Sequence, residues 1–172
     1  MDAAPSGHPP LAVAKYFVED VPQKWIRAWP EAYANPIVVL FFSATHDRTV
    51  GDTTPWCSAF LNWCLKKSGI DGTHSAGSQS FARWGTTVWG YREGGSLKDA
   101  RAGDIAIFRH KSDPVHGHVA FFERISTQQN DSIVVLGGNH IDRRTHLIQE
   151  KTLRINSDLQ LVRIATRNGM RS

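Results

Sequence analysis

Both cysteines of the chain, Cys57 and Cys64, lie in one short segment, TPWCSAFLNWC (residues 54–64). They could form a disulfide, bind a metal or fill the core, or one of them could be a catalytic nucleophile. From Pro55 onward the apolar residues recur at helical spacing, which predicts that both cysteines lie in one helix. Seven helical residues separate two Cα atoms by about 10 Å, whereas a disulfide requires less than about 7 Å. The helix prediction therefore excludes a disulfide between them.

The surroundings of the two thiols predict different roles. Structural zinc sites use closely spaced cysteine pairs with further Cys or His ligands, a pattern that Cys57, Cys64 and His74 do not have. We therefore expect no metal and no cofactor. Cys64 falls in the middle of the helix, where a free cysteine is usually a small buried apolar residue. Cys57 falls in the first turn, where unpaired N–H groups and the helix dipole lower a thiol's pKa and stabilise an oxyanion. On position alone, a core role for Cys57 fits equally well.

A cysteine nucleophile needs a base, and His118 is the candidate. The segment VHGHVAFF (115–122) has the alternation of a strand that starts near His118, and Gly117 lets another element approach closely. The segment IVVLGGNH (133–140) predicts a neighbouring strand that ends near Asn139, whose amide oxygen could accept from the His118 ring and fix its tautomer. Because any fold contains many His and Asn residues, ordinary surface roles remain open for both.

The elements that must position these residues are helices in the first half of the chain and strands in the second. Apolar spacing predicts a helix over residues 11–33, interrupted or bounded by Pro22 and Pro30, while residues 37–45 fit either a helix or a strand. Further predictions are loops over 47–54 and 71–79, helices over 55–68 and 78–85, and strands over 103–108, 117–124, 132–138, 146–153 and 159–166. Helices followed by an antiparallel sheet indicate an α+β fold. We expect a flexible tail over residues 1–10 and a single domain over 11–172.

Composition excludes several classes of protein. The 172 residues are 41% apolar and 21% charged, with a net charge of +4, as in an ordinary globular protein. The basic residues are scattered and form no nucleic-acid-binding motif, so we expect no nucleic-acid partner. No apolar run reaches the ~20 residues that span a membrane. The first ten residues do not have the pattern of a signal peptide, so we expect synthesis in the cytoplasm and any export by a signal-independent route.

Four segments in order carry a resemblance to a known family: DTTPWCSAFLNWCLKKSGIDGTHSA, AGDIAIF, GHVAFF and VLGGN. Together they resemble papain-like peptidoglycan hydrolases of the CHAP and NlpC kind, over roughly residues 52–140. The resemblance implies a papain-like α+β fold in which the nucleophile's helix packs on an antiparallel sheet and the histidine lies on an adjacent strand.

Carried over to this chain, the resemblance implies Cys57 as nucleophile, His118 as base and Asn139 as the group that orients His118, with His140 as a possible substitute for Asn139. Many CHAP members have Glu two residues before the Asn, where this chain has Gly137. Asp104 is expected to brace its strand. The candidates for substrate contact are Trp56, Ser58, Trp84 and Trp89, and a core role fits the tryptophans about equally well.

The implied activity is hydrolysis of an amide bond in peptidoglycan, either within the stem peptide or between muramic acid and L-alanine. One expected setting is an antibacterial effector of the type VI secretion kind, which acts in a target cell's periplasm and has a cognate immunity protein. The alternatives are a phage endolysin, a cysteine hydrolase of another amide, and a non-catalytic binding module with the same fold.

Overall fold

Proline and asparagine residues occupy the N-terminal positions of the first two helices. The structure, a computed structural model, describes residues 5–29, 35–47 and 54–170. Helix α1 (Pro10–Glu19) and helix α2 (Pro36–Phe41) both begin with proline, whose missing N–H is not needed in a first turn. The Asn35 side chain caps α2 by accepting from Ile37 N at 2.9 Å. The segment 37–45, which fitted either a helix or a strand, is therefore mainly helical.

The other helical segments largely follow the predicted order. Pro22 separates α1 from the 3₁₀ turn η1 (Gln23–Trp25), and η2 (Phe42–Ala44) continues α2. The short helix expected over 78–85 is the 3₁₀ segment η3 (Ser78–Arg83), and a further 3₁₀ turn, η4, spans Leu97–Asp99. Most of the loop expected over 47–54 lies outside the described residues, as do residues 1–4 of the expected tail. Within that tail, Gly7 N donates to Lys67 O at 3.1 Å.

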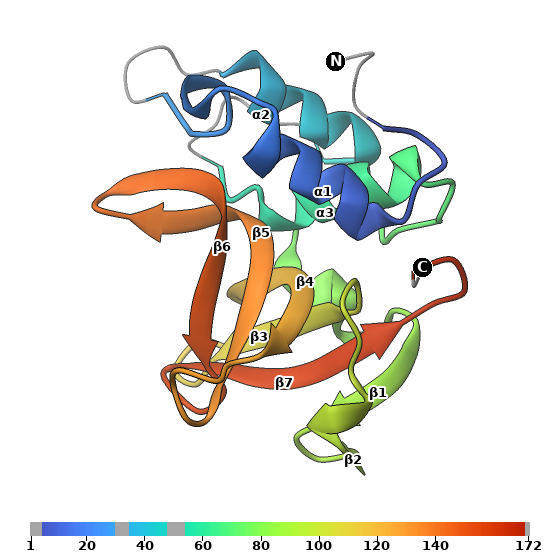
Figure 1. Ribbon diagram of the computed structural model, residues 1–172, viewed down its shortest axis with the longest axis vertical. Coiled ribbons are helices and arrows are strands. Elements are labelled where there is room, and N and C mark those ends of the chain that lie inside the picture. Colours follow the sequence, from blue (N-terminus) through green and yellow to red (C-terminus); the bar gives the residue numbers. More distant parts are fainter. Residues whose placement is uncertain (1–4, 30–34, 48–53, 171–172) are drawn as a thin grey trace.

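Helix α3 (Cys57–Lys67) is the central helix of the fold. Its residues from Cys57 to Leu65 are all buried, because α3 lies between the other helices and strands β4 and β5 (Figure 1). On the helical side, edge-to-face aromatic contacts join Phe60 and Trp63 to the neighbouring helices, with ring centroids 5.1–5.7 Å apart. The helix ends at Lys67 and is followed by Ser68 and by Gly69, whose φ of 71° suits a residue without a side chain.

The described strands form a seven-stranded antiparallel sheet in the order β2-β1-β7-β3-β4-β5-β6. Their bounds are Thr86–Gly90 (β1), Gly94–Gly95 (β2), Ile105–His110 (β3), Gly117–Ile125 (β4), Ser132–Asp142 (β5), Thr145–Arg154 (β6) and Leu159–Thr166 (β7). The five predicted strands are present. Strands β1 and β2 were not predicted. The sequence of β1 is short and ends in glycine, and β2 consists of two glycines, so neither has an alternation of apolar residues.

Each face of the sheet buries its own apolar core. Ile107, Val119 and Phe121 face the helices, while Phe108 and Ala120 belong to a second core on the opposite face. The N-terminal segment also covers the edge strand β6: Ala28 N donates to His146 O at 2.7 Å, and Ile148 N donates to Ile26 O at 2.8 Å. This pairing removes an exposed strand edge.

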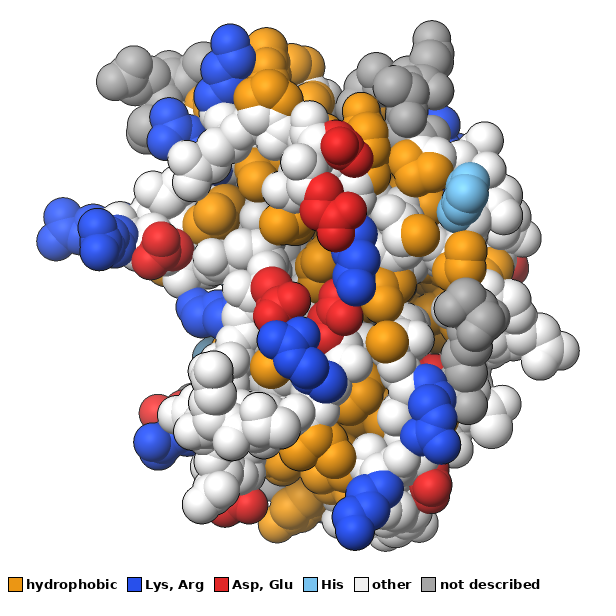
Figure 2. Space-filling model, viewed as in Figure 1, with side chains coloured by type: hydrophobic (Ala, Val, Ile, Leu, Met, Phe, Trp, Pro, Cys, Tyr) orange, Lys and Arg blue, Asp and Glu red, His pale blue; other side chains and the backbone are white. Residues whose placement is uncertain are grey.

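The face shown in Figure 2 carries acidic and basic side chains side by side, as the scattered charges of the sequence indicate. Arg143 and Arg144 form the turn between β5 and β6, both exposed and at positive φ. Figure 2 shows Lys or Arg side chains at the tip where Figure 1 places this turn. Among the described residues, no helix is both long and apolar enough to span a membrane.

Candidate active site

Cys57 is the first residue of α3, and its side chain reaches one wall of a cavity of about 630 Å³. His118, Asn139 and His140 line the same cavity. Cys57 is only 2% exposed, so the thiol lies at the base of the cavity. Cys64 is free and fully buried in the middle of the same helix. The structure thus brings together the residues that the resemblance implied for nucleophile, base and orienting group.

His118 lies near the start of β4, beside its β3 partner Phe108, and lines the cavity that Cys57 of α3 also lines. Its ring centroid is 6.4 Å from that of Phe108 and 4.5 Å from that of His140. Gly117 has no space for a side chain, because a Cβ there would collide with Phe108 O and the Gln79 amide. The start of β4 is therefore packed closely against β3 and Gln79, while the rings of Phe108 and His140 neighbour the imidazole of His118.

A β-bulge in β5 decides which residue meets His118. Gly137 pairs with Gln149 and His140 with Leu147, so β5 has one residue more than β6 across this stretch. In a regular strand, Asn139 would share a face with Gly137, which lies against Ala120 on the His118 side of the sheet. The extra residue places His140 on that face instead.

Asn139 has a different partner. Its backbone φ is 62°, and its Oδ1 lies 2.8 Å from Nδ1 of His146. The expected pairing of Asn139 with His118 is therefore replaced by a pairing of Asn139 with His146, while the His140 ring lies beside His118. Nε2 of His118 and Nε2 of His140 are both buried without a hydrogen-bond partner among the described residues.

Burial keeps the catalytic candidates uncharged. Desolvation, with a smaller contribution from the positive charge of Lys151, lowers the pKa of His118 to about 4. Burial also lowers the pKa of His140 well below its usual value, helped by His118 and Lys151. Burial raises the pKa of Cys57, although backbone hydrogen bonds from Val119, Ser58 and Cys57 itself act in the opposite direction. The lowered thiol pKa expected at the helix start is therefore wrong, because desolvation outweighs the helix N–H groups.

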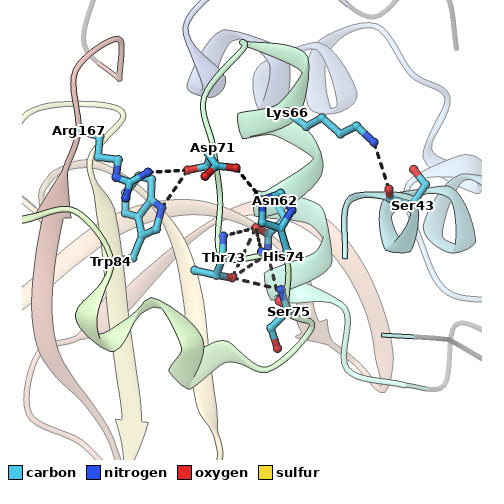
Figure 3. Close-up of polar contacts among 9 residues, drawn as sticks. All are labelled: Ser43, Asn62, Lys66, Asp71, Thr73, His74, Ser75, Trp84 and Arg167. Atoms are coloured by element: carbon cyan, nitrogen blue, oxygen red, sulfur yellow. Dashed lines mark hydrogen bonds and ion pairs between the residues drawn. The ribbon is translucent and has the colours of Figure 1, made fainter. Parts of the chain in front are cut away.

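A loop anchored on α3 forms another wall of the cavity. The Asn62 side chain accepts from Thr73 N at 2.7 Å and from His74 N at 3.1 Å, and donates to Ser75 O at 3.0 Å (Figure 3). Ala76, two residues from His74, lines the cavity. A single buried amide thus holds this wall against the helix that carries Cys57.

The start of the same loop is fixed by contacts with the sheet side of the molecule. Asp71 O accepts from Trp84 Nε1 at 3.1 Å and from Arg167 at 2.9 Å, and the Asp71 carboxylate lies 2.6 Å from His74 Nε2 (Figure 3). The Arg167 guanidinium lies over the Trp84 ring, 4.9 Å from its centroid. Trp84 is therefore a structural residue.

The structure places the four candidates for substrate contact outside the described lining of the cavity. Trp56 is fully buried against Gly138, where a Cβ would collide with its ring. Ser58 is also fully buried, and its hydroxyl donates to Ser75 O at 2.6 Å. Trp89 packs against the second core. These three side chains therefore pack within the fold rather than along the cavity.

Asp104 braces the turn before β3. It is fully buried, and its Oδ2 accepts from Arg101 N at 2.9 Å. Lys151 and His110 also line the cavity, although neither had a signal in the sequence. Lys151 comes from β6, opposite Val135, and only the pairing register shows that it faces the site. Within the described part of the chain, no group of three or more His, Cys, Asp or Glu side chains could hold a metal ion.

The family comparison agrees with this geometry. The family model described as CHAP domain matches residues 49–139, which is more than half of the chain and contains Cys57, His118 and Asn139. No curated protein and no solved structure matches the chain. The match confirms the resemblance seen in the sequence, and the helices packed on an antiparallel sheet are consistent with the papain-like fold that it implied.

Burial of His118 makes the stability of the fold depend on pH. Its pKa is about 4 in the folded protein, while that of an unfolded histidine is about 6.5. The unfolded chain therefore binds an extra proton between these values, so stability is full above pH 6.5 and falls as the pH is lowered to 4. We predict that the urea midpoint falls less from pH 7.5 to 4.5 in His118→Gln than in the wild type. Equal losses in both proteins would contradict a buried, neutral His118.

Proposed function

Because the chain belongs to the CHAP domain family, we propose that Cys57 is its nucleophile, His118 its base and His140 the residue that orients His118. The family acts on peptidoglycan by a cysteine–histidine mechanism, so the protein is a hydrolase of the amidase or endopeptidase kind with peptidoglycan as its substrate. The observation that supports the residue assignment is the single cavity shared by Cys57, at a helix start, and His118, on the neighbouring strand.

The proposed reaction begins from a neutral thiol and a neutral imidazole. His118 takes the Cys57 proton as the sulfur attacks the amide carbonyl carbon, and N–H groups at the start of α3 stabilise the oxyanion. His118 then donates the proton to the leaving nitrogen, the C–N bond breaks and a thioester remains. Water attacks the thioester while His118 accepts a proton from it. Return of that proton to the sulfur releases the carboxylic acid and restores the thiol.

The proposed role of His140 rests on the β5 bulge. The two imidazoles are 4.5 Å apart between ring centroids, and each has a buried Nε2 without a partner among the described residues. A hydrogen bond between these rings would satisfy both nitrogens and fix the tautomer of His118. In this proposal Asn139, which is paired with His146, does not contact His118 and instead stabilises the β5 bulge that positions His140.

For the biological setting, we favour an antibacterial effector that acts in the cell wall of a target cell after signal-independent export. Two observations support action at the wall: the family's substrate and a net charge of +4, which favours a polyanion. An immunity protein would neutralise such an effector by filling the cavity above Cys57. The second setting, a phage endolysin, shares the same chemistry but has no immunity partner.

The proposed nucleophile is tested by a matched pair of cysteine variants. Cys57→Ala should abolish release of fragments from purified sacculi, whereas Cys64→Ala should only lose stability, by roughly 1–3 kcal/mol. Mass spectrometry of the wild-type digest identifies the bond cleaved. Equal loss of turnover in two well-folded variants would rule out the assignment. A folded wild type that releases nothing from sacculi would point to another amide or to a binding module.

The orienting residue is tested by comparing His140→Phe, His140→Gln and Asn139→Ala. We predict that His140→Phe lowers kcat about 10- to 100-fold, less than loss of the base itself. His140→Gln should retain more activity, because its amide can still accept a hydrogen bond. Asn139→Ala should be milder than His140→Phe. An active His140→Phe beside an inactive Asn139→Ala would return the orienting role to Asn139.

The site of action is tested by expression in two compartments of a Gram-negative host. The cytoplasm contains no assembled sacculus, so we predict that cytoplasmic expression is tolerated. Fusion to a secretory signal should round or lyse the cells, and the Cys57→Ala version of that fusion should be harmless. Growth curves and microscopy measure the outcome. Toxicity in the cytoplasm alone would indicate an intracellular substrate.

A further inference from the structure

A second cavity, of about 360 Å³, lies next to the catalytic one, and its lining includes Arg92, Arg109, Lys111 and Arg163. We call it the basic cavity. Its walls come from the turn after β1 (residues 91–93), the end of β3 and the residue after it (109–111), and β7 (160–163). His110 lines both cavities, so they adjoin at this residue.

Two charged side chains of the basic cavity, Arg163 and Glu93, already have partners within the fold. The buried Arg163 donates to Trp84 O at 2.8 Å and to the Thr87 hydroxyl at 2.9 Å. Glu93 accepts from the same hydroxyl at 2.7 Å and lies 4.0 Å from Arg163. Glu93, the only acidic residue of the described lining, is therefore balanced by Arg163.

Three further cations of the lining form no ion pair among the described residues. Arg109 donates from Nε to Gln79 Oε1 at 3.0 Å, a bond that does not use its two terminal nitrogens. Arg92 and Lys111 have no hydrogen-bonded or ion-paired side-chain partner among the described residues. Three uncompensated cations around one concave site attract an anion, and an arginine fork suits the two oxygens of a carboxylate.

We propose that the basic cavity is a subsite for a free carboxylate of the peptidoglycan stem peptide, an inference that rests on the proposed function. Stem peptides carry several free carboxylates close to their amide bonds, so an adjoining anionic subsite would place such a bond in the catalytic cavity. Tyr91, 60% exposed at the rim, offers an aromatic face to the aliphatic part of the peptide. Gln79 links the two cavities, because it binds Arg109 and also packs against Gly117, the neighbour of His118.

The test uses the double variant Arg92→Gln/Lys111→Gln, since neither residue lines the catalytic cavity. The substrate is a soluble, cross-linked disaccharide-peptide fragment, either with free carboxylates or with those groups converted to amides. With the free-carboxylate fragment, KM should rise about 10-fold at unchanged kcat, as expected for loss of charged hydrogen bonds. With the amidated fragment, wild type and variant should have the same KM.

The matched control is Lys98→Gln/Arg154→Gln, which removes the same charge from exposed positions outside both cavities. If the control raises KM as much as the double variant, general electrostatic attraction explains the effect and the subsite is overturned. An unchanged KM in the double variant overturns it as well, while the hydrolase assignment stands. Inorganic phosphate is added as a competitor of the free-carboxylate fragment. If phosphate displaces the fragment as readily as unlabelled fragment does, the cavity is a nonspecific anion site and the proposal is also overturned.

Failure of the proposed function is recognised separately, as a wild type that cleaves no peptidoglycan. In that case, calorimetric binding of the free-carboxylate fragment to Cys57→Ala decides the subsite. Binding that weakens about 10-fold in the background of the double variant, and not in that of the control, would support it. Absence of binding would reject it.

Discussion

The contact between the start of α3 and strands β4 and β5 is the constraint on which the site depends. Trp56 is fully buried over Gly138, and the backbone N–H of Val119 hydrogen-bonds to the Cys57 sulfur. This contact brings a helix N-terminus next to His118. A side chain at Gly138 would collide with Trp56 and separate helix from sheet, so the glycine is needed for its lack of volume. The position of Cys57 is thus set by core packing.

The same burial determines the charge state of the site. Desolvation raises the pKa of Cys57 and lowers those of His118 and His140, so the resting pair is neutral. A neutral pair costs less to bury than a thiolate and an imidazolium. In the proposed reaction, proton transfer from Cys57 is therefore coupled to attack on the carbonyl, and charge forms only as the helix N–H groups meet the oxyanion.

Two irregular segments of backbone position the other side chains of the cavity. The β5 bulge exchanges Asn139 for His140 beside His118, and the Asn62 amide holds the loop that carries Ala76. Both devices change which side chains reach the cavity without altering the order of the elements. They also explain how a chain with the CHAP pattern of Cys, His and Asn can place a second imidazole next to His118.

Patterns along the chain are sufficient to predict the family and most of the helices and strands, and they single out Cys57 and His118 as the candidate nucleophile and base. These follow from local information: apolar periodicity, proline and glycine positions, and motifs read along the chain. Other features follow only from the folded chain: His140 lies beside His118, Trp56 and Trp84 are buried, and Lys151 lines the cavity that adjoins the basic cavity at His110. Those facts depend on strand register, on one extra residue in β5 and on burial, all of which arise from contacts between residues far apart in the chain.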